Sequence, residues 1–569
     1  MNQQPSTTPS GGGPTWIGVT ATSCLVLAVG TGWALHQLRV VTFDGLLEYI
    51  RDARTLREGG LSAYQHAVHP FGYPTLLALV RAATPSLFAA SRVVSWWSGI
   101  AALALYALVI RAAFGASEAR WAAPAALIGS ALVAHTLEPS STLPAATLQL
   151  ASIWLFLSGQ DRVARLAGAG AVVGLAWLLR YPSLLVFGAT ALWLMAANRR
   201  SPRRLGILLA AYALPFFAVA SPQIVLNLKH GLDPLIANNA GYILRAQRGH
   251  FAANQTIASM LLLEGRRAAA FWASNLADFV LFNSPLLAAM ALVLKRDRSA
   301  RVTYLATVIA VQQLILPLTN FNPKFYLLDR WLMLGFVVRA LRDAAPALGD
   351  AWSRRATANG SRWLRITAAG LLAALAAPLA TAYLAFRIAE VWSMLGDDEV
   401  GAAHQEITAA LYDRGYRGPG EILGCSNVHY DLHALADDRV VYYREAARQL
   451  PSIPRFSNGD TLARFLREHG FRFVLYDDED RGPCPDLGFL FEPEALPDTL
   501  TPVVIDDFYN QTDRLALYQL APEPPAPLAA SERVGRWLAV RKPSLKGLLD
   551  DWARGLADAA ASANEDGER

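Results

Sequence analysis

Cysteine and charged residues are both scarce in this sequence. Three of its 569 residues are cysteine, and 17% are Asp, Glu, Lys or Arg. So few cysteines exclude a disulfide-dense secreted domain, and no Cys or His spacing is typical of a metal site. A soluble globular protein carries about a quarter charged residues, so the low charge excludes that class as well.

Apolar residues take the place of the missing charge. Hydrophobic residues make up 53% of the chain, the mean hydropathy is +0.26, and there are 15 Trp and 23 Phe. Long helices that face lipid, with aromatic anchors at the interfaces, have this composition. The sequence therefore predicts a polytopic α-helical membrane protein.

Motifs for nucleotide and nucleic-acid chemistry are also missing. The sequence has no Gly-rich phosphate loop and no Ser/His/Asp set in a family context. The formal net charge is +5, but residues 397–520 hold 23 acidic and 11 basic residues, a net charge of −12. This asymmetry indicates two compartments rather than a nucleic-acid partner.

About eleven apolar segments are predicted to cross a bilayer. Residues 1–15 contain no Lys or Arg, so the first span is expected to be an uncleaved anchor after a cytoplasmic tail. Residues 71–80, flanked by Pro74 and Pro85, are expected to lie at the membrane interface. The predicted spans are 16–38, 93–110, 121–137, 143–157, 166–179, 183–197, 205–226, 271–294, 302–319, 325–338 and 366–388.

Lys and Arg gather in alternate loops between these spans. The basic loops are 111–120, 162–165, 199–204, 295–301 and 339–365. By the positive-inside rule this side is cytoplasmic, which places the N-terminus in the cytoplasm and the C-terminal part outside an inner or plasma membrane. The loop 227–267 is basic but external, and it suits either lipid headgroups or a donor phosphate.

The C-terminal part has a different pattern. Helical candidates at 401–412 and 461–468 alternate with β-rich runs at 440–443, 471–476, 503–505 and 515–520. This pattern predicts an external α/β domain over residues 391–520, and Cys425 could pair with Cys484 there. Residues 521–532 read as a linker. Residues 533–569 read as an amphipathic helix and tail, on the membrane surface or packed on the domain.

The predicted first external loop, residues 39–92, carries the most informative motifs. They are Asp44, the Tyr49…Ala53 spacing, Gly59-Gly60 and the turn Gly72-Tyr73-Pro74. In these residues the chain resembles the GT-C glycosyltransferases, polytopic membrane enzymes that use polyprenyl-phosphate sugars. Protein mannosyltransferases and aminoarabinose transferases are examples. The resemblance covers roughly residues 16–390 in layout, and it implies a GT-C-like transmembrane domain.

Asp44 has two compatible interpretations. A carboxylate at the external mouth of a helix bundle can take the proton of an acceptor hydroxyl, and the resemblance implies this catalytic role. Asp before a helix is equally a favoured N-cap. Glu48 follows one turn later on the same face, where it can bind substrate or, together with Asp44, a divalent cation such as Mg or Mn. The alternative for Glu48 is a solvent-facing charge.

Glu138 and Arg180 stand between apolar spans, where a charge is costly unless it faces a polar cavity. The resemblance implies that Glu138, in the second external loop, positions the acceptor or a cation. The alternative is an interfacial cap for a helix that begins near Ser140. Arg180 lies in a very short hairpin, where its guanidinium suits a donor phosphate or, alternatively, lipid headgroups.

Three further residues are expected to bind the donor. Arg245 lies in the basic external loop, and Lys324 and Tyr326 lie just before a late span. Related enzymes often carry an Arg-Tyr pair before this span, whereas this chain has Lys324-Phe325-Tyr326. The resemblance thus implies a phosphate contact here through a different pair of residues.

These features together predict an inverting membrane glycosyltransferase. It would move a sugar from a polyprenyl-phosphate donor to a lipid, glycan or protein acceptor on the external face of the membrane. The alternative is a transporter or flippase-like protein without catalysis. That alternative predicts internal repeats or paired half-helices, which the sequence does not contain.

Overall fold

The computed structural model divides the chain into two compact units. A mainly helical unit comprises residues 1–36, 49–82 and 91–383, and a second unit with the β-strands comprises residues 37–48, 83–90 and 384–569. The structure describes residues 15–37, 46–64, 69–129, 131–159, 162–235, 273, 276–277, 283–316, 326–356, 405–425, 431–434, 439–442, 450, 453–477, 487–492, 494, 496–507, 514–521 and 529–542.

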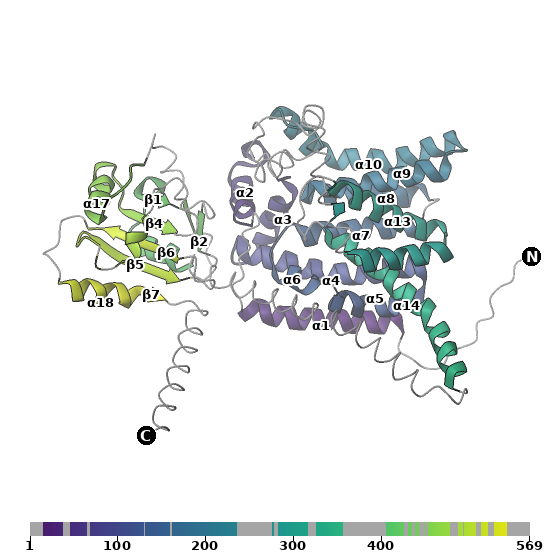
Figure 1. The fold of residues 1–569 in the computed structure, drawn as a ribbon. Helices are drawn as coiled ribbons and strands as arrows, with labels where there is room; N and C mark the ends of the chain where they lie inside the picture. Colours follow the sequence, from purple (N-terminus) through teal and green to yellow (C-terminus); the bar gives the residue numbers. More distant parts are fainter. Residues whose placement is uncertain are drawn as a thin grey trace, which may run out of the picture. The chain divides into compact units, whose positions relative to one another are not determined.

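The helical unit is a bundle of long helices with shorter helices at one end (Figure 1). Its α-helices are α1 (Trp16–Gln37), α2 (Leu46–Gly59), α3 (Gly72–Val80), α4 (Leu87–Phe114), α5 (Ala116–Gly129), α6 (Leu132–Leu137), α7 (Thr142–Ser158), α8 (Val163–Leu179), α9 (Leu184–Asn198), α10 (Pro202–Lys229), α13 (Ala300–Ile315) and α14 (Leu327–Ala356). Residues 283–296 are also helical. The 3₁₀ helices are η1 (Leu61–Ala63), η2 (Arg81–Ala83) and η3 (Tyr181–Ser183).

Within the described residues, four helical segments are long and apolar enough to cross a membrane. They are α1, α4, the segment Tyr181–Asn198 and α10. The helices α7, α8 and α13 are apolar but shorter. The predicted interfacial segment is α3, and Pro74 lies in its first turn rather than before it. Proline is tolerated there because the first-turn N–H groups have no partner within the helix.

Two predicted spans differ from the observed helices. The span 121–137 is divided between α5 and α6. The span 325–338 continues as α14 to Ala356, because Arg339 and Arg342 extend the helix with ion pairs after the apolar run has ended. The predicted span 366–388 and the first part of the span 271–294 lie outside the described residues.

The helices α8 and α10 pack backbone to backbone. A Cβ atom added at Gly170 would lie 1.9 Å from the carbonyl oxygen of Tyr212, and one at Gly174 would lie 3.1 Å from that of Phe216. Small residues at such positions let apolar helices approach closely where lipid gives no hydrophobic driving force. Trp177, on α8, is fully buried in this core.

Contacts of the predicted basic loops identify one end of the bundle. At this end, Arg301 Nη1 donates to the carbonyl oxygen of Ala112 at 3.1 Å, and the Arg111 guanidinium lies 4.7 Å from the Trp16 ring centroid. We call this the arginine end; its residues are Arg111, Glu118, Arg301, Arg339 and Arg342. Three of the basic loops predicted to share one side of the membrane therefore meet in space.

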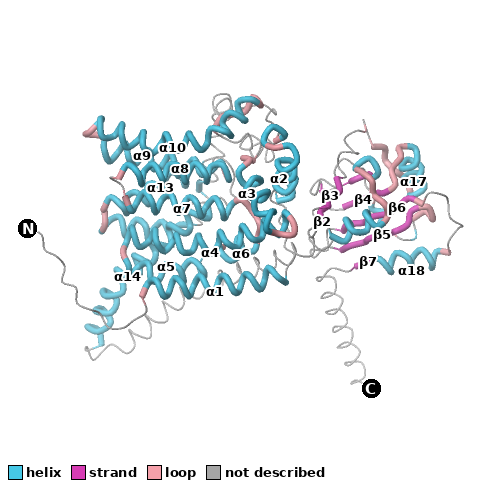
Figure 2. Tube along the Cα trace, turned by 180° about the vertical axis from the view of Figure 1, so that it is seen from behind, coloured by secondary structure: helices cyan, strands magenta, loops and turns pink. Residues whose placement is uncertain are grey.

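The second unit is a mixed sheet with helices on both faces (Figure 2). The strands β1 (Ile422–Cys425), β4 (Phe473–Asp477), β6 (Arg514–Leu520), β5 (Leu500–Asp507) and β7 (Arg541–Lys542) lie side by side in that order, and β2 (Asp431–Ala434) pairs with β3 (Arg439–Tyr442). β1 is parallel to β4 and β7 to β5, whereas β6 is antiparallel to β4 and β5. Short 3₁₀ turns are η6 (Pro419–Glu421) and η7 (Gly488–Phe491).

Alternating side chains bury both faces of this sheet. Val474 and Tyr476 pack toward α17 (Gly459–Glu468) and α18 (Ala530–Val540), whereas Phe473 and Leu475 pack toward the helix over 405–413. Trp537 of α18 donates from Nε1 to the hydroxyl of Tyr518 at 3.2 Å. The described part of the predicted amphipathic helix therefore packs on the sheet.

The observed elements also refine the C-terminal prediction. α17 confirms the predicted helix 461–468, and β3, β4, β5 and β6 confirm the four predicted strands. α18 begins at Ala530, within the predicted linker, and ends at β7, which the sequence did not predict. Residues 543–569 and Cys484 lie outside the described residues, so pairing of Cys425 with Cys484 stays a prediction.

Candidate functional site

The end of the bundle opposite the arginine end contains α2, α3 and the turn between α8 and α9 (Figures 1 and 2). Segments far apart in sequence meet there through buried polar side chains. We call it the site end; the residues that define it are Tyr49, His69, Ser141, Arg180 and Asn227. Two of the predicted site residues, Glu138 and Arg180, lie in its turns.

Tyr49 lies at the centre of the site end. It is on the buried face of α2 with Ile50 and Ala53, and 3% of its surface is exposed. Its hydroxyl lies 3.0 Å from His69 Nδ1 and 2.9 Å from Ser141 Oγ. Because Tyr49 and Ser141 are 92 residues apart, this hydroxyl joins two loops that the sequence leaves unconnected.

A second tyrosine holds the backbone of the same histidine. The Tyr64 hydroxyl donates to the carbonyl oxygen of His69 at 2.7 Å. Burial raises the pKa of Tyr64 above its ordinary value, and the nearby carboxylate of Asp52 raises it further, so this hydroxyl stays protonated. Asp52 is itself buried, and one of its oxygens lies 3.7 Å from Arg51 Nε.

Arg180 lies where α8 ends. Its backbone is extended, with φ −158° and ψ 122°, and η3 begins at the next residue with Pro182 in its first turn. The Arg180 guanidinium donates to the hydroxyl of Thr142, the first residue of α7. The structure therefore joins the predicted phosphate-binding arginine to the second inter-helix loop.

Glu138 lies in that second loop, at the C-cap of α6. One of its carboxylate oxygens lies 3.3 Å from His135 Nδ1, and a quarter of its side chain is exposed. The N-cap of α7 is Ser141, so Glu138 does not cap the following helix, and that alternative is wrong. The Ser141 hydroxyl forms no cap hydrogen bond to α7 either, because it pairs with Tyr49 instead.

The turn Gly72-Tyr73-Pro74 lies directly against α8. A Cβ atom at Gly72 would lie 2.3 Å from the carbonyl oxygen of Leu178, so only glycine allows this approach. The preceding amide, that of Phe71, donates to Gln223 Oε1 at 2.9 Å. The start of α3 is thus fixed between α8 and α10. Its contact on α8, Leu178, lies two residues before Arg180.

Gln223 belongs to a buried amide and hydroxyl cluster. Gln223 Nε2 donates to Asn227 Oδ1 at 2.6 Å, and the Tyr181 hydroxyl lies 3.2 Å from the same oxygen. Asn227 Nδ2 in turn donates to the carbonyl oxygen of Asp233 at 3.2 Å. Because the cluster is neutral, it fixes the start of the predicted loop 227–267 without burying a charge.

Tyr326 is the third predicted residue that the structure describes. It is fully buried and packs with Leu316, which follows α13, and with Leu185 of α9. Three residues later, the fully buried Asp329 accepts a hydrogen bond from Gln313 Nε2 at 2.8 Å. Tyr326 thus packs against apolar side chains, three residues before the Asp329 that pairs with Gln313.

The structure describes none of the remaining predicted side chains. Asp44, Arg245 and Lys324 lie outside the described residues, and Glu48 lies in the first turn of α2 with its side chain outside them. Across the described part of the chain, no three His, Cys, Asp or Glu side chains lie close enough to hold a metal ion. The side chains of the predicted cation ligands, Asp44 and Glu48, lie outside that part of the chain.

Tyr49, His69 and Ser141 are the residues that the sequence did not single out as site residues. Tyr49 stands four residues before Ala53 in the sequence, and helical periodicity places both on one face of α2. Its partners come from two other loops, and no local pattern predicts which distant hydroxyl it meets. The sequence signal for Tyr49 is its position on the apolar face of an otherwise polar helix.

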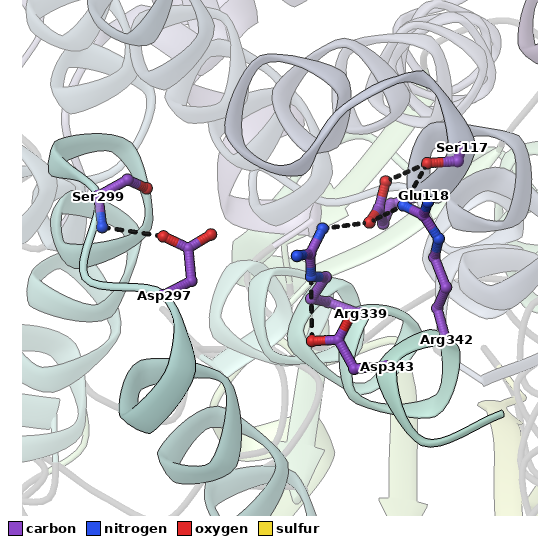
Figure 3. A network of polar contacts seen from close by, with 7 residues as sticks. All are labelled: Ser117, Glu118, Asp297, Ser299, Arg339, Arg342 and Asp343. Carbon is purple, nitrogen blue, oxygen red and sulfur yellow. Dashed lines mark hydrogen bonds and ion pairs between the residues drawn. The ribbon is translucent and has the colours of Figure 1, made fainter. Parts of the chain in front are cut away.

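A different polar cluster fixes the arginine end (Figure 3). Glu118 of α5 accepts hydrogen bonds from Arg339 Nη1 at 2.6 Å, from Arg342 Nη1 at 2.5 Å and from the Ser117 hydroxyl at 2.6 Å. Burial by itself raises the pKa of Glu118, but these hydrogen bonds outweigh it and hold the pKa below its ordinary value. Glu118 thus pairs with both arginines and ties α5 to α14, and we call Glu118, Arg339 and Arg342 the clamp.

No family model and no curated protein match the sequence. Among solved structures, the apo oligosaccharyltransferase of Archaeoglobus fulgidus is 13% identical, with a TM-score of 0.50 over 82% of this chain and 70% of that one. The same enzyme in complex with Zn and sulfate is 15% identical, with a TM-score of 0.50 over 81% and 68%.

ArnT from Cupriavidus metallidurans bound to undecaprenyl phosphate is also similar. It is 11% identical, with a TM-score of 0.48 over 90% of this chain and 99% of that one. At these identities the comparison with the oligosaccharyltransferase establishes the fold. The chain is structurally similar to GT-C glycosyltransferases.

Proposed function

We propose that this protein is an inverting membrane glycosyltransferase that moves a sugar from a polyprenyl-phosphate donor to a lipid, glycan or protein acceptor. The observation that carries the proposal is the position of Arg180. In a fold similar to that of a GT-C enzyme, its guanidinium is held by Thr142 at the end of the bundle where three inter-helix segments meet.

Arg180 would neutralise the phosphate of the donor. A guanidinium pairs with phosphate oxygens through two parallel hydrogen bonds and stabilises the charge that develops as the phosphate leaves. Lys324, Tyr326 and Arg245 would complete the donor site. The donor's polyprenyl chain would lie in the surrounding lipid, which explains why the phosphate site belongs at the end of an apolar bundle.

Asp44 would act as the base. It takes the proton of the acceptor hydroxyl while the acceptor oxygen attacks the anomeric carbon from the face opposite the phosphate. The bond from that carbon to the phosphate oxygen breaks, and polyprenyl phosphate leaves. Glu138 would position the acceptor, and Glu48 would bind substrate. A divalent cation, Mg²⁺ or Mn²⁺, held by Asp44 and Glu48 would share the phosphate charge.

The reaction would take place on the external face of an inner or plasma membrane. The basic loops that meet at the arginine end support a cytoplasmic position for that end, and therefore an external position for the site end.

Deletion of the gene and complementation test the proposal. Mass spectrometry of the envelope lipids, glycans and proteins should detect a sugar that disappears on deletion and returns with the wild-type gene. Asp44→Asn should fail to restore it, whereas Asp297→Asn, which removes an acid beside the arginine end, should restore it fully. An unchanged set of envelope sugars after deletion contradicts the proposed function, and restoration by Asp44→Asn at equal expression contradicts the role of Asp44.

A further inference from the structure

The hydroxyl of Tyr49 contacts two other segments of the site end, and the proposed reaction assigns it no function. It lies within hydrogen-bond distance of His69 and of Ser141, and 3% of the residue is exposed. Water therefore has little access to this hydroxyl. A single oxygen atom connects α2, the segment before α3 and the first turn of α7.

Ser141 carries this connection to the predicted phosphate site. It is the N-cap residue of α7, a position where the serine hydroxyl usually accepts from a backbone N–H of its own helix. Here the hydroxyl pairs with Tyr49 and makes no cap bond. The next residue, Thr142, accepts the hydrogen bond of Arg180. Tyr49 and Arg180 thus hold adjacent residues of one turn.

The rings around Tyr49 restrict its hydroxyl to this position. The Tyr49 ring lies 4.8 Å from the Tyr73 ring in an edge-on contact and 4.6 Å from the His69 ring. The His69 backbone is held separately by Tyr64. With the ring fixed on two sides, a shift of α2 would move the Ser141–Thr142 turn with it.

We propose that Tyr49 is a positioning residue of the transfer site, which fixes the Ser141–Thr142 turn and through it the guanidinium of Arg180. This inference rests on the proposed function. Catalysis by orientation is sensitive to displacements of about 1 Å, so loss of this link lowers turnover without removing any group that touches substrate.

The test replaces Tyr49 by Phe, which keeps the ring and removes the hydroxyl. The matched control is Tyr106→Phe, because Tyr106 is 1% exposed and its hydroxyl has no hydrogen-bond partner in the described part of the chain. Transfer is measured in reconstituted vesicles with the polyprenyl-phosphate derivative of the sugar that the deletion experiment identifies. We expect kcat to fall about tenfold or more for Tyr49→Phe and to stay unchanged for Tyr106→Phe.

A second variant shows whether the effect passes through Ser141. Ser141→Ala should lower kcat by a similar factor, and the double variant Tyr49→Phe, Ser141→Ala should lose no more than either single variant. Hydrogen exchange over residues 138–142 should increase in Tyr49→Phe and not in Tyr106→Phe, a readout that needs no activity.

The outcomes separate the two proposals. A wild-type protein that transfers no sugar contradicts the proposed function, whatever hydrogen exchange shows. An active wild type with unchanged kcat and unchanged exchange in Tyr49→Phe overturns the positioning role and leaves the function intact. If Tyr49→Phe does not fold, Ser141→Ala decides: full activity in that variant overturns the inference.

Discussion

The two ends of the helical bundle are held together by different chemistry. At the arginine end, one buried carboxylate, that of Glu118, is paired with two guanidinium groups. At the site end, the links between segments are mostly neutral, as in the pairs of Tyr49 with Ser141 and of Gln223 with Asn227. The contacts named at the arginine end are ion pairs, whereas those named at the site end are hydrogen bonds between neutral groups.

This difference indicates where a charged substrate can be bound. A guanidinium that already pairs with a carboxylate has little attraction left for a phosphate, as for Arg339 at the arginine end. Arg180 instead donates to the neutral hydroxyl of Thr142. Glu138 pairs with a histidine and keeps a quarter of its side chain exposed.

The largest expected effect comes from exchanging an arginine at each end. Arg180→Gln should reduce sugar transfer about 100-fold, because the leaving phosphate loses its guanidinium partner. Arg342→Gln removes an equal charge at the arginine end and should leave transfer per folded protein unchanged. Activity in reconstituted vesicles, normalised to folded protein, checks both. Equal losses in the two variants would contradict the assignment of the ends.

The next largest effect concerns the close approach of α3 to α8. Gly72→Ala forces a Cβ atom against the carbonyl oxygen of Leu178 and should lower stability by about 2–3 kcal/mol. Gly188→Ala is the matched control, since open space surrounds that position in α9 and alanine favours a helix. Thermal unfolding of the purified protein measures both, and an equal midpoint in the two variants refutes the contact.

A smaller loss is expected when the clamp at the arginine end is weakened. Glu118→Gln keeps the shape of the side chain but removes its charge, and it should cost about 1–2 kcal/mol of stability. Asp343→Asn, which affects a partly exposed pair with Arg339, should cost about 0.5 kcal/mol or less. Transfer activity per folded protein should change in neither variant. A loss of turnover in Glu118→Gln at full folding would mean that this end also takes part in the reaction.

The smallest effect is the dependence of the clamp on pH. The folded-state pKa of Glu118 is lower than its ordinary value, so its charge stabilises the folded protein above the unfolded-state pKa. That contribution is lost as the pH falls through the lower folded-state pKa. The stability difference between wild type and Glu118→Gln should therefore be constant near neutral pH and vanish in acid. A difference that grows on acidification contradicts the lowered pKa.

Apolar periodicity and length predicted most of the individual helices. The runs that became α7, α8 and α10 were found within a few residues, because a lipid-facing helix needs an uninterrupted apolar segment. Apolar length does not predict the end of a helix where polar contacts continue or interrupt it. α14 continues past its apolar run because Arg339 and Arg342 pair with Glu118, which lies more than 200 residues earlier in the sequence.

The strands of the second unit also divide into those that a local pattern predicts and those that only strand pairing identifies. β4 and β6 carry clear runs of β-branched and aromatic residues, and the sequence located them. β1 and β7 are short, and neither could be assigned before the strand beside it was placed. A two-residue strand such as β7 exists only through its pairing with β5.

The sequence by itself determined that this chain is a bundle of apolar helices followed by an acidic α/β unit, because hydropathy and charge are local properties that accumulate along the chain. It also located Glu138 and Arg180 as charges that the bundle must place at its ends. Only the tertiary structure decided that Arg180 contacts Thr142 and that Tyr49 links His69 to Ser141. Hydrogen bonds form between atoms a few ångströms apart in space, and no pattern along the chain encodes which distant segment supplies the partner.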